Sequence, residues 1–65
     1  MYRTIERQGD QLRSLTEHNT LTEAQDYAVH LIRERRKQRR ATALEIERGN
    51  DLFGFYTVAE YATKG

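Results

Sequence analysis

The chain has 65 residues, 37% of them hydrophobic and 32% charged, with a formal net charge of +1 and with neither cysteine nor proline. This length allows one domain over residues 1–65, and the lack of cysteine excludes disulfides, thiolate metal sites and cysteine nucleophiles. No apolar run approaches the roughly 18 residues of a membrane-spanning helix, and the N-terminus lacks the apolar core of a signal peptide, so we expect a cytoplasmic protein without membrane contact.

The first predicted element is a β-hairpin over about residues 1–16. Its turn signal is Gln8–Gly9, and a turn there pairs Ile5 with Leu12 on one face of the sheet. The same pattern, Ile-Glu-Arg-x-x-Asp-x-(Leu/Phe), recurs 41 residues later in the chain. Because residues 11–19 are polar, the second strand could instead be short and give way to a loop.

The clearest predicted element is a helix over about residues 21–37. Thr20 begins a capping box, in which the Glu23 side chain can reach back to the cap amide. At about 100° per residue, one stripe of this helix is apolar, and Arg35 ends the stripe. Its members are Leu21, Ala24, Tyr27, Ala28, Leu31 and Ile32.

A basic block follows, since residues 33–40 contain six basic residues and one acidic residue. The spacing i, i+3, i+4, i+7 predicts a basic stripe opposite the apolar one. Such a stripe can contact the phosphates of a nucleic acid or an acidic protein surface, although it can also be a solvated helix end. No helix-turn-helix or basic-zipper pattern predicts sequence-specific DNA reading. The stripe consists of Arg33, Arg36, Lys37 and Arg40.

A second hairpin is predicted over about residues 41–61. Gly49–Asn50 suits a two-residue turn because both residues tolerate positive φ. Residues 57–64 could instead form a final helical turn, but the β-branched and aromatic residues before them favour a strand. The predicted pairs are Arg48 with Asp51, Ile46 with Phe53 and Leu44 with Phe55.

Together these elements predict an α+β fold, a ββαββ domain in which one helix packs on one face of a four-stranded antiparallel sheet. The lengths match, because a seven-residue strand spans roughly 23 Å and a 17-residue helix roughly 25 Å. The apolar stripe of the helix would cover the sheet. The expected core residues of the sheet are Ile5, Leu12, Leu44, Ile46, Phe53 and Phe55.

The opposite face of this sheet would have no cover. Such a face can be an ordinary solvated surface, or it can dock a partner protein or a second copy in a homodimer, which would add the burial that a small monomer lacks. Tyrosine is a typical anchor residue of such interfaces. The residues that we assign to this surface are Tyr2, Leu52, Tyr56 and Val58.

Catalytic motifs are missing from the sequence. His18 and His30 have no partners at metal-ligand spacing, and we interpret both as solvent-exposed. Glu45 and Glu47 lie on the same face of one predicted strand, and we interpret them as a polar edge rather than a catalytic pair. There is no glycine-rich phosphate loop, nucleophile elbow or zinc spacing. We therefore expect no enzyme activity, no metal and no cofactor.

The chain opens its helix with Thr20–Ala24, and Ala43–Asn50 turns into Leu52–Tyr56. This hairpin–helix–hairpin layout resembles small proteins of bacteriophages and mobile elements, among them certain anti-CRISPR inhibitors of type I surveillance complexes. The resemblance implies a non-catalytic inhibitor that docks on a host protein or nucleoprotein complex, such as a CRISPR surveillance complex. The alternative is a small nucleic-acid-binding module that contacts the nucleic acid backbone with the basic stripe.

Overall fold

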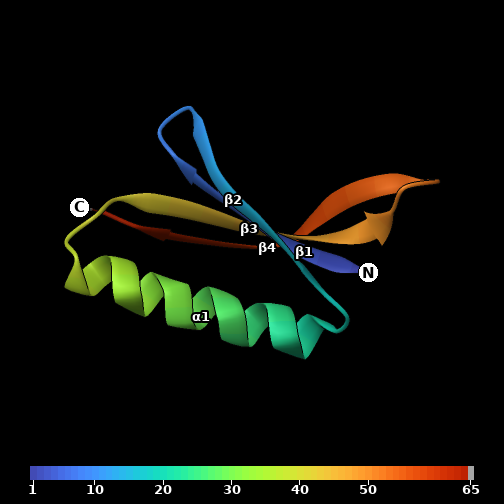
Figure 1. Ribbon diagram of the computed structural model, residues 1–65, viewed down its shortest axis with the longest axis horizontal. Coiled ribbons are helices and arrows are strands. Elements are labelled where there is room, and N and C mark those ends of the chain that lie inside the picture. Colours follow the sequence, from blue (N-terminus) through green and yellow to red (C-terminus); the bar gives the residue numbers. More distant parts are fainter. Residues whose placement is uncertain (65) are drawn as a thin grey trace.

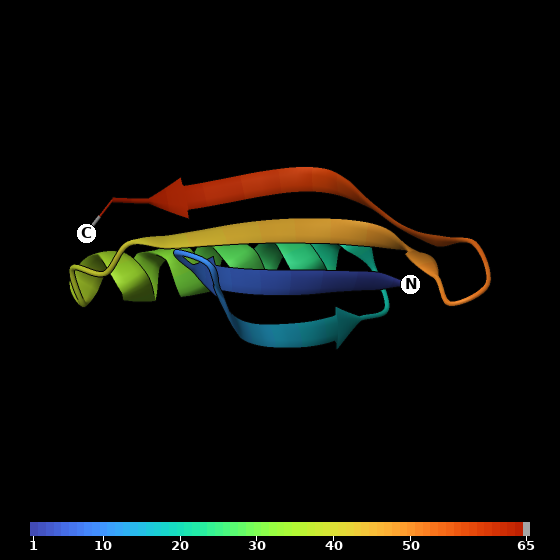
Figure 2. The same ribbon diagram turned by 90° about the horizontal axis from the view of Figure 1, so that it is seen from above.

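A computed structural model, which describes residues 1–64, has two β-hairpins joined by a helix (Figure 1). The elements are β1 (Tyr2–Gln8), β2 (Gln11–His18), α1 (Leu21–Lys37), β3 (Thr42–Asn50) and β4 (Gly54–Thr63). The strands form one antiparallel sheet in the order β2-β1-β3-β4, and α1 lies across one face and contacts every strand (Figure 2). The predicted ββαββ fold is confirmed. None of the helices in residues 1–64 is both long and apolar enough to cross a membrane.

Both ends of α1 are closed by local hydrogen bonds. At the start, Thr20 Oγ1 accepts from the Glu23 amide at 3.2 Å, and Glu23 Oε2 accepts from the amide of Asn19 at 3.2 Å, one residue before the expected cap amide. At the end, the Arg39 amide donates to Arg36 O and the Arg40 amide donates to Arg35 O, at 3.1 and 2.9 Å. This pair of bonds is a Schellman motif. It ends the helix at Lys37 and places Arg40 beyond it.

The core lies between α1 and β3. Ala24 and Ala28 are fully buried, and their small side chains let the helix approach Leu44 and Ile46 of β3 closely. Ile32 completes this cluster at the C-terminal half of the helix. Half-buried side chains pack around the cluster, namely Tyr2, Leu21, Leu31, Ala59 and Tyr61.

The register of the first hairpin differs from the prediction. Its turn is Gly9–Asp10, with Gly9 at φ 61°, one residue later than expected. Ile5 pairs with Leu15, and it faces away from α1 because Thr4 and Glu6 on either side of it point toward the helix layer. Leu12 is 60% exposed. The predicted Ile5–Leu12 core pair is therefore wrong. The polar residues of β2 form a full strand.

The second hairpin also turns later than predicted. Gly49 and Asn50 belong to β3, and the turn is Asp51–Phe53. Asn50 Oδ1 organises this turn by accepting from the amides of Leu52 and Phe53, at 3.0 and 2.8 Å. Gly54 then supplies a left-handed φ of 83°, which a glycine adopts without strain.

This later turn changes which residues of β4 reach the core. Leu44 pairs with Tyr61 and Ile46 with Ala59, and a β-bulge lies between Ile46 and Glu47 in the register. Residues 57–63 continue the strand, so the alternative of a helical turn is wrong. Leu44 and Ile46 are core residues as predicted, whereas the prediction is wrong for Phe53, which lies in the exposed turn, and for Phe55, which lies on the face opposite α1.

A buried ion pair joins β1 to the C-terminal half of α1. Glu6 is 1% exposed, and Arg35 donates to both of its carboxylate oxygens, at 2.7 and 3.0 Å. The Thr42 hydroxyl donates to the same carboxylate at 2.7 Å. The hydrogen bonds from Arg35 hold the pKa of Glu6 below its ordinary value of 4.5 although burial opposes this shift. Arg35 thus continues the packed side of the helix beyond its apolar stripe.

Candidate docking site

The face of the sheet opposite α1 is covered by its own charged side chains. Arg3 donates to Glu47 at 2.6 Å, and Arg7 lies 3.2 Å from the Glu45 carboxylate. The Arg3 guanidinium also stacks 3.7 Å above the ring of Phe55, a cation–π contact. Ile5, only 5% exposed, lies on this face too. Paired charges therefore cover much of this face, where the sequence left open either a solvated surface or a docking surface.

The residues predicted to share this face are separated in the structure. Tyr2 packs against the core cluster on the α1 side. Tyr56 pairs with Arg48, which shares the α1 side with Leu44 and Ile46 of the same strand. Leu52 lies in the β3–β4 turn, and Val58 is the bulge residue of β4, between the partners of Ile46 and Glu47. The predicted grouping of Tyr2, Leu52, Tyr56 and Val58 on one open face is wrong, because the β3–β4 turn begins two residues later than predicted and Tyr2 faces α1.

Exposed apolar side chains gather instead at the end of the second hairpin. We call this region the tip and define it as Met1, Arg48, Leu52, Phe53 and Tyr56. Leu52 is 82% exposed, Phe53 85% and Tyr56 58%. Figure 2 shows the β3–β4 turn extending past the N-terminus and past the first turn of α1. The tip is the part of the described chain that projects farthest from the core at this end.

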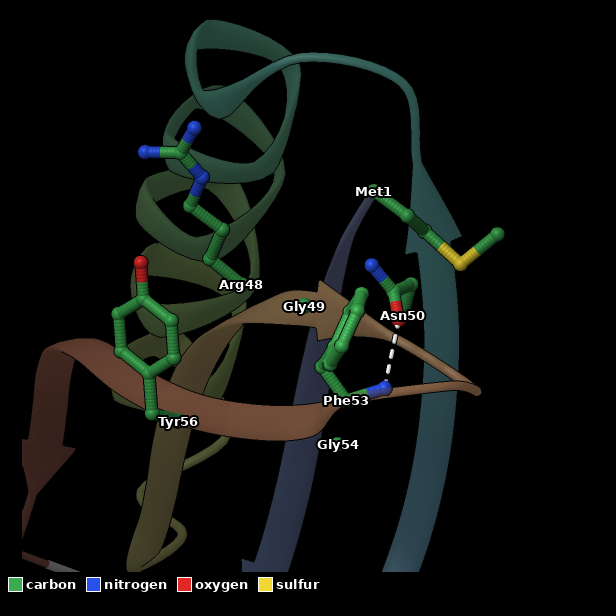
Figure 3. A pocket seen from close by; sticks show the side chains of 7 residues that line it. All are labelled: Met1, Arg48, Gly49, Asn50, Phe53, Gly54 and Tyr56. Carbon is green, nitrogen blue, oxygen red and sulfur yellow. Dashed lines mark hydrogen bonds between the residues drawn. The ribbon is translucent and has the colours of Figure 1, made fainter.

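A hollow of about 430 Å³ opens within the tip (Figure 3). The side chains of Arg48 and Tyr56 rise on one side of it, whereas Met1 extends on the other side. The Phe53 ring stands between them, next to Asn50. The hollow is lined by Met1, Arg48, Gly49, Asn50, Phe53, Gly54 and Tyr56.

The backbone of the tip is held tightly although its side chains are exposed. The Gly49 amide donates to Met1 O at 3.1 Å and so attaches the first residue to the hairpin. A Cβ on Gly49 would collide with the Gly54 carbonyl oxygen and lie 2.7 Å from Phe55 Cα. Only glycine therefore allows the two strands to approach here. With the two bonds to Asn50 Oδ1, these contacts fix the direction in which Leu52 and Phe53 project.

The predicted basic stripe lies at the opposite end of the molecule. Arg33, Arg36 and Lys37 are exposed on α1, as expected, whereas Arg40 follows the Schellman motif. The Thr63 hydroxyl donates to Arg40 O at 2.9 Å and brings the last residues of β4 alongside. Figure 1 shows the end of α1 and the end of β4 at the same end of the molecule. We call this region the basic end and define it as Arg33, Arg36, Lys37, Arg39, Arg40 and Lys64.

The two histidines have different surroundings. His30 is exposed on α1, as predicted. His18 is half-buried, with Nε2 3.0 Å from Thr4 Oγ1 and its ring 5.1 Å from the ring of Tyr27, so its expected exposure is wrong. Within residues 1–64, no three His, Asp or Glu side chains are grouped as metal ligands.

The sequence predicted two residues of the tip, Leu52 and Tyr56, as docking residues but missed Phe53, which we expected in the core. Two signals could have located it, namely the ability of Asn50 to cap a turn and a glycine four residues later, at Gly54. Arg48 and Met1 had no signal, since only the folded register brings them beside Tyr56 and Phe53. No protein-family model, curated protein or solved structure matches this chain. The geometry of the two ends therefore carries the functional proposals.

Proposed function

We propose that this chain is a non-catalytic binding protein that docks through the tip on a host protein or nucleoprotein complex in the cytoplasm. The observation that carries this proposal is the exposure of Leu52 and Phe53 on a turn whose backbone is fixed by hydrogen bonds. Burying one such side chain is worth about 1.5–3 kcal/mol. In the free chain Leu52 and Phe53 stay in solvent. Their burial in an apolar pocket of a partner would therefore contribute this free energy to binding.

The neighbours of these two side chains support a protein partner. Tyr56 and Arg48 belong to the residue types that are enriched at the energetic centres of protein interfaces. The hollow beside them offers room for a side chain of the partner. A rigid turn loses little conformational entropy on binding, so more of the contact free energy becomes affinity.

An inhibitory role follows from the same surface. A chain of 7.7 kDa that inserts a projecting apolar turn can block a host complex by occupying one of its binding surfaces. This action needs no catalytic group, and it agrees with the role implied by the resemblance to anti-CRISPR inhibitors. A CRISPR surveillance complex is one complex of this kind.

Capture from a bacterial lysate tests this function. The chain is immobilised, the lysate is applied at about 0.5 M salt, where surface charges are screened, and the retained proteins are identified by mass spectrometry. We expect one host complex to be retained. The tip variant, Leu52→Ser with Phe53→Ser, should retain less than about a tenth of it, because the loss of one apolar anchor of 1.4 kcal/mol or more lowers affinity about tenfold.

The matched control is Leu12→Ser with Val29→Ser. These two side chains are also apolar and exposed, but they lie on β2 and on α1, away from the tip. The control should capture the complex as the unmodified chain does. Equal capture by the tip variant, or retention of nucleic acid alone, would contradict docking through the tip.

A further inference from the structure

We propose that the basic end is a second binding site, which takes the phosphodiester backbone of a nucleic acid without reading its sequence. The site shares no residue with the tip. The proposal rests on the ion pairing and on the backbone of the helix end, neither of which enters the proposal for the tip.

The cations of the basic end are largely unneutralised. Three arginines of β1 and of the packed side of α1 have carboxylate partners, in the pairs Arg3–Glu47, Arg7–Glu45 and Arg35–Glu6. In the basic end, the ion pairs found among residues 1–64 involve Lys37 alone, which lies 3.7 Å from Glu34 in an exposed pair. Exposed pairs of this type contribute little. The positive potential of this region is therefore open to a ligand.

The fold gathers these cations from three segments. Arg33, Arg36 and Lys37 come from α1, and the Schellman motif folds Arg39 and Arg40 back against the helix end. The bond from Thr63 to Arg40 then holds the end of β4 beside them, which adds Lys64. The result is a patch around one end of the molecule, broader than the single helical stripe that the sequence predicts.

The helix dipole alone does not account for this patch. A helix C-terminus carries roughly half a negative charge, and its influence falls off within the last turn. Arg35, Arg36 and Lys37 already occupy that turn. Arg39 is stronger evidence that the cations have a role besides complementing the dipole. Its φ of 53° is the left-handed conformation in which glycine is favoured at this position of the motif. The chain carries a charge where an uncharged glycine would stabilise the fold better.

The chemistry of the patch favours phosphate groups. Arginine forks match phosphate oxygens in bidentate geometry, and four of the residues that define the basic end are arginines. The strongly exposed aromatic residues, Phe53 and Tyr56, lie at the tip, so base stacking is not offered at this end. Contacts to phosphates without stacking or groove reading produce binding that is independent of sequence.

Fluorescence anisotropy with a labelled DNA duplex of about 20 base pairs, and with RNA of the same sequence, tests this site. Non-specific binding of this kind has Kd values of roughly 10⁻⁴ to 10⁻⁶ M at physiological salt and strengthens steeply as salt is lowered. The patch variant is Arg33→Gln with Arg36→Gln. It should raise Kd at low salt about tenfold and reduce the slope of log Kd against log salt by up to about 1.8, since each contact contributes roughly 0.9 on duplex DNA.

The control variant is Thr22→Glu with Gln25→Glu, which lowers the net charge by the same amount on exposed positions of the first turns of α1. It should leave Kd within about twofold of the unmodified chain, because screening limits the effect of distant charges. Equal losses in both variants would overturn a local site. Absence of binding to DNA and RNA, or equally tight binding of polyaspartate, would overturn the assignment to nucleic acid.

The outcome for this site is separable from that for the tip. The variant Leu52→Ser with Phe53→Ser should bind the duplex as the unmodified chain does, and circular dichroism checks that every variant keeps its helix. A failed host capture with intact duplex binding would remove the tip proposal alone, whereas the reverse result would remove the basic end alone.

Discussion

The tip and the basic end differ in how they come to be exposed. At the tip, apolar side chains remain in solvent because the turn begins two residues later than the strongest local turn signal, so Phe53 never reaches the sheet. At the basic end, two consecutive arginines point in directions about 100° apart around the helix, and Arg35 is paired to buried Glu6 whereas Arg36 is exposed. Each region therefore shows that the exposure of a side chain depends on contacts with residues far away in the sequence as well as on the local sequence pattern.

The difference between Arg35 and Arg36 has the largest expected effect. Arg35→Gln leaves the Glu6 carboxylate buried without its counter-charge, which should lower the free energy of unfolding by about 3 kcal/mol. Arg36→Gln should change it by less than about 0.5 kcal/mol, because the side chain is exposed. Urea unfolding followed by circular dichroism measures both. Equal effects would mean that the Glu6–Arg35 pair does not support the fold.

Gly49 is the position of the tip where we expect a small substitution to lower the stability of the fold. Gly49→Ala places a methyl group against the Gly54 carbonyl and the Phe55 backbone, and overpacking of this kind costs about 1–3 kcal/mol. We expect displaced amide resonances throughout the β3–β4 turn and a lower melting temperature. The matched control, Leu52→Ala, removes an exposed side chain of the same turn and should leave stability unchanged. An undisturbed turn in Gly49→Ala would contradict the close approach of the strands.

At the basic end, by contrast, the introduction of a glycine should stabilise the chain. Arg39→Gly removes the steric cost of a left-handed φ but also increases the backbone entropy of the unfolded chain. We expect the free energy of unfolding to rise by about 0.5–1 kcal/mol as the net result. Gln38→Gly is the control, because Gln38 has a right-handed φ of −79° and glycine there should destabilise. A loss of stability in Arg39→Gly, measured by thermal unfolding, would show that the arginine side chain itself supports the helix end.

Much of the fold follows from local patterns in the sequence. The capping box at Thr20 and the apolar stripe that Arg35 ends correctly predict a helix over Leu21–Lys37, and two turn signals correctly predict two hairpins. The strand registers do not follow, because side chains alternate between faces and a later turn moves a residue from one face to the other. A β-bulge in each hairpin shifts the pairing of the strands once more, and no residue in the sequence predicts these bulges.

The candidate sites divide in the same way. Arg33, Arg36 and Lys37 of the basic stripe are exposed as predicted, since a helical wheel depends only on spacing along one element. The tip depends on the register of β3 with β4 and on the bond that brings Met1 to Gly49, so it emerges only in the folded chain. The pairing of Glu6 with Arg35 joins residues far apart in sequence and could not be read from either segment.

The most direct test of the account is to compare the tip and basic-end variants in one capture experiment from a bacterial lysate at about 0.5 M salt. The account predicts that Arg33→Gln with Arg36→Gln retains the host complex, whereas Leu52→Ser with Phe53→Ser loses it while keeping the helix signal of the unmodified chain. Retention of the complex by the tip variant, or its loss in the basic-end variant, would contradict the claim that the tip is the docking surface.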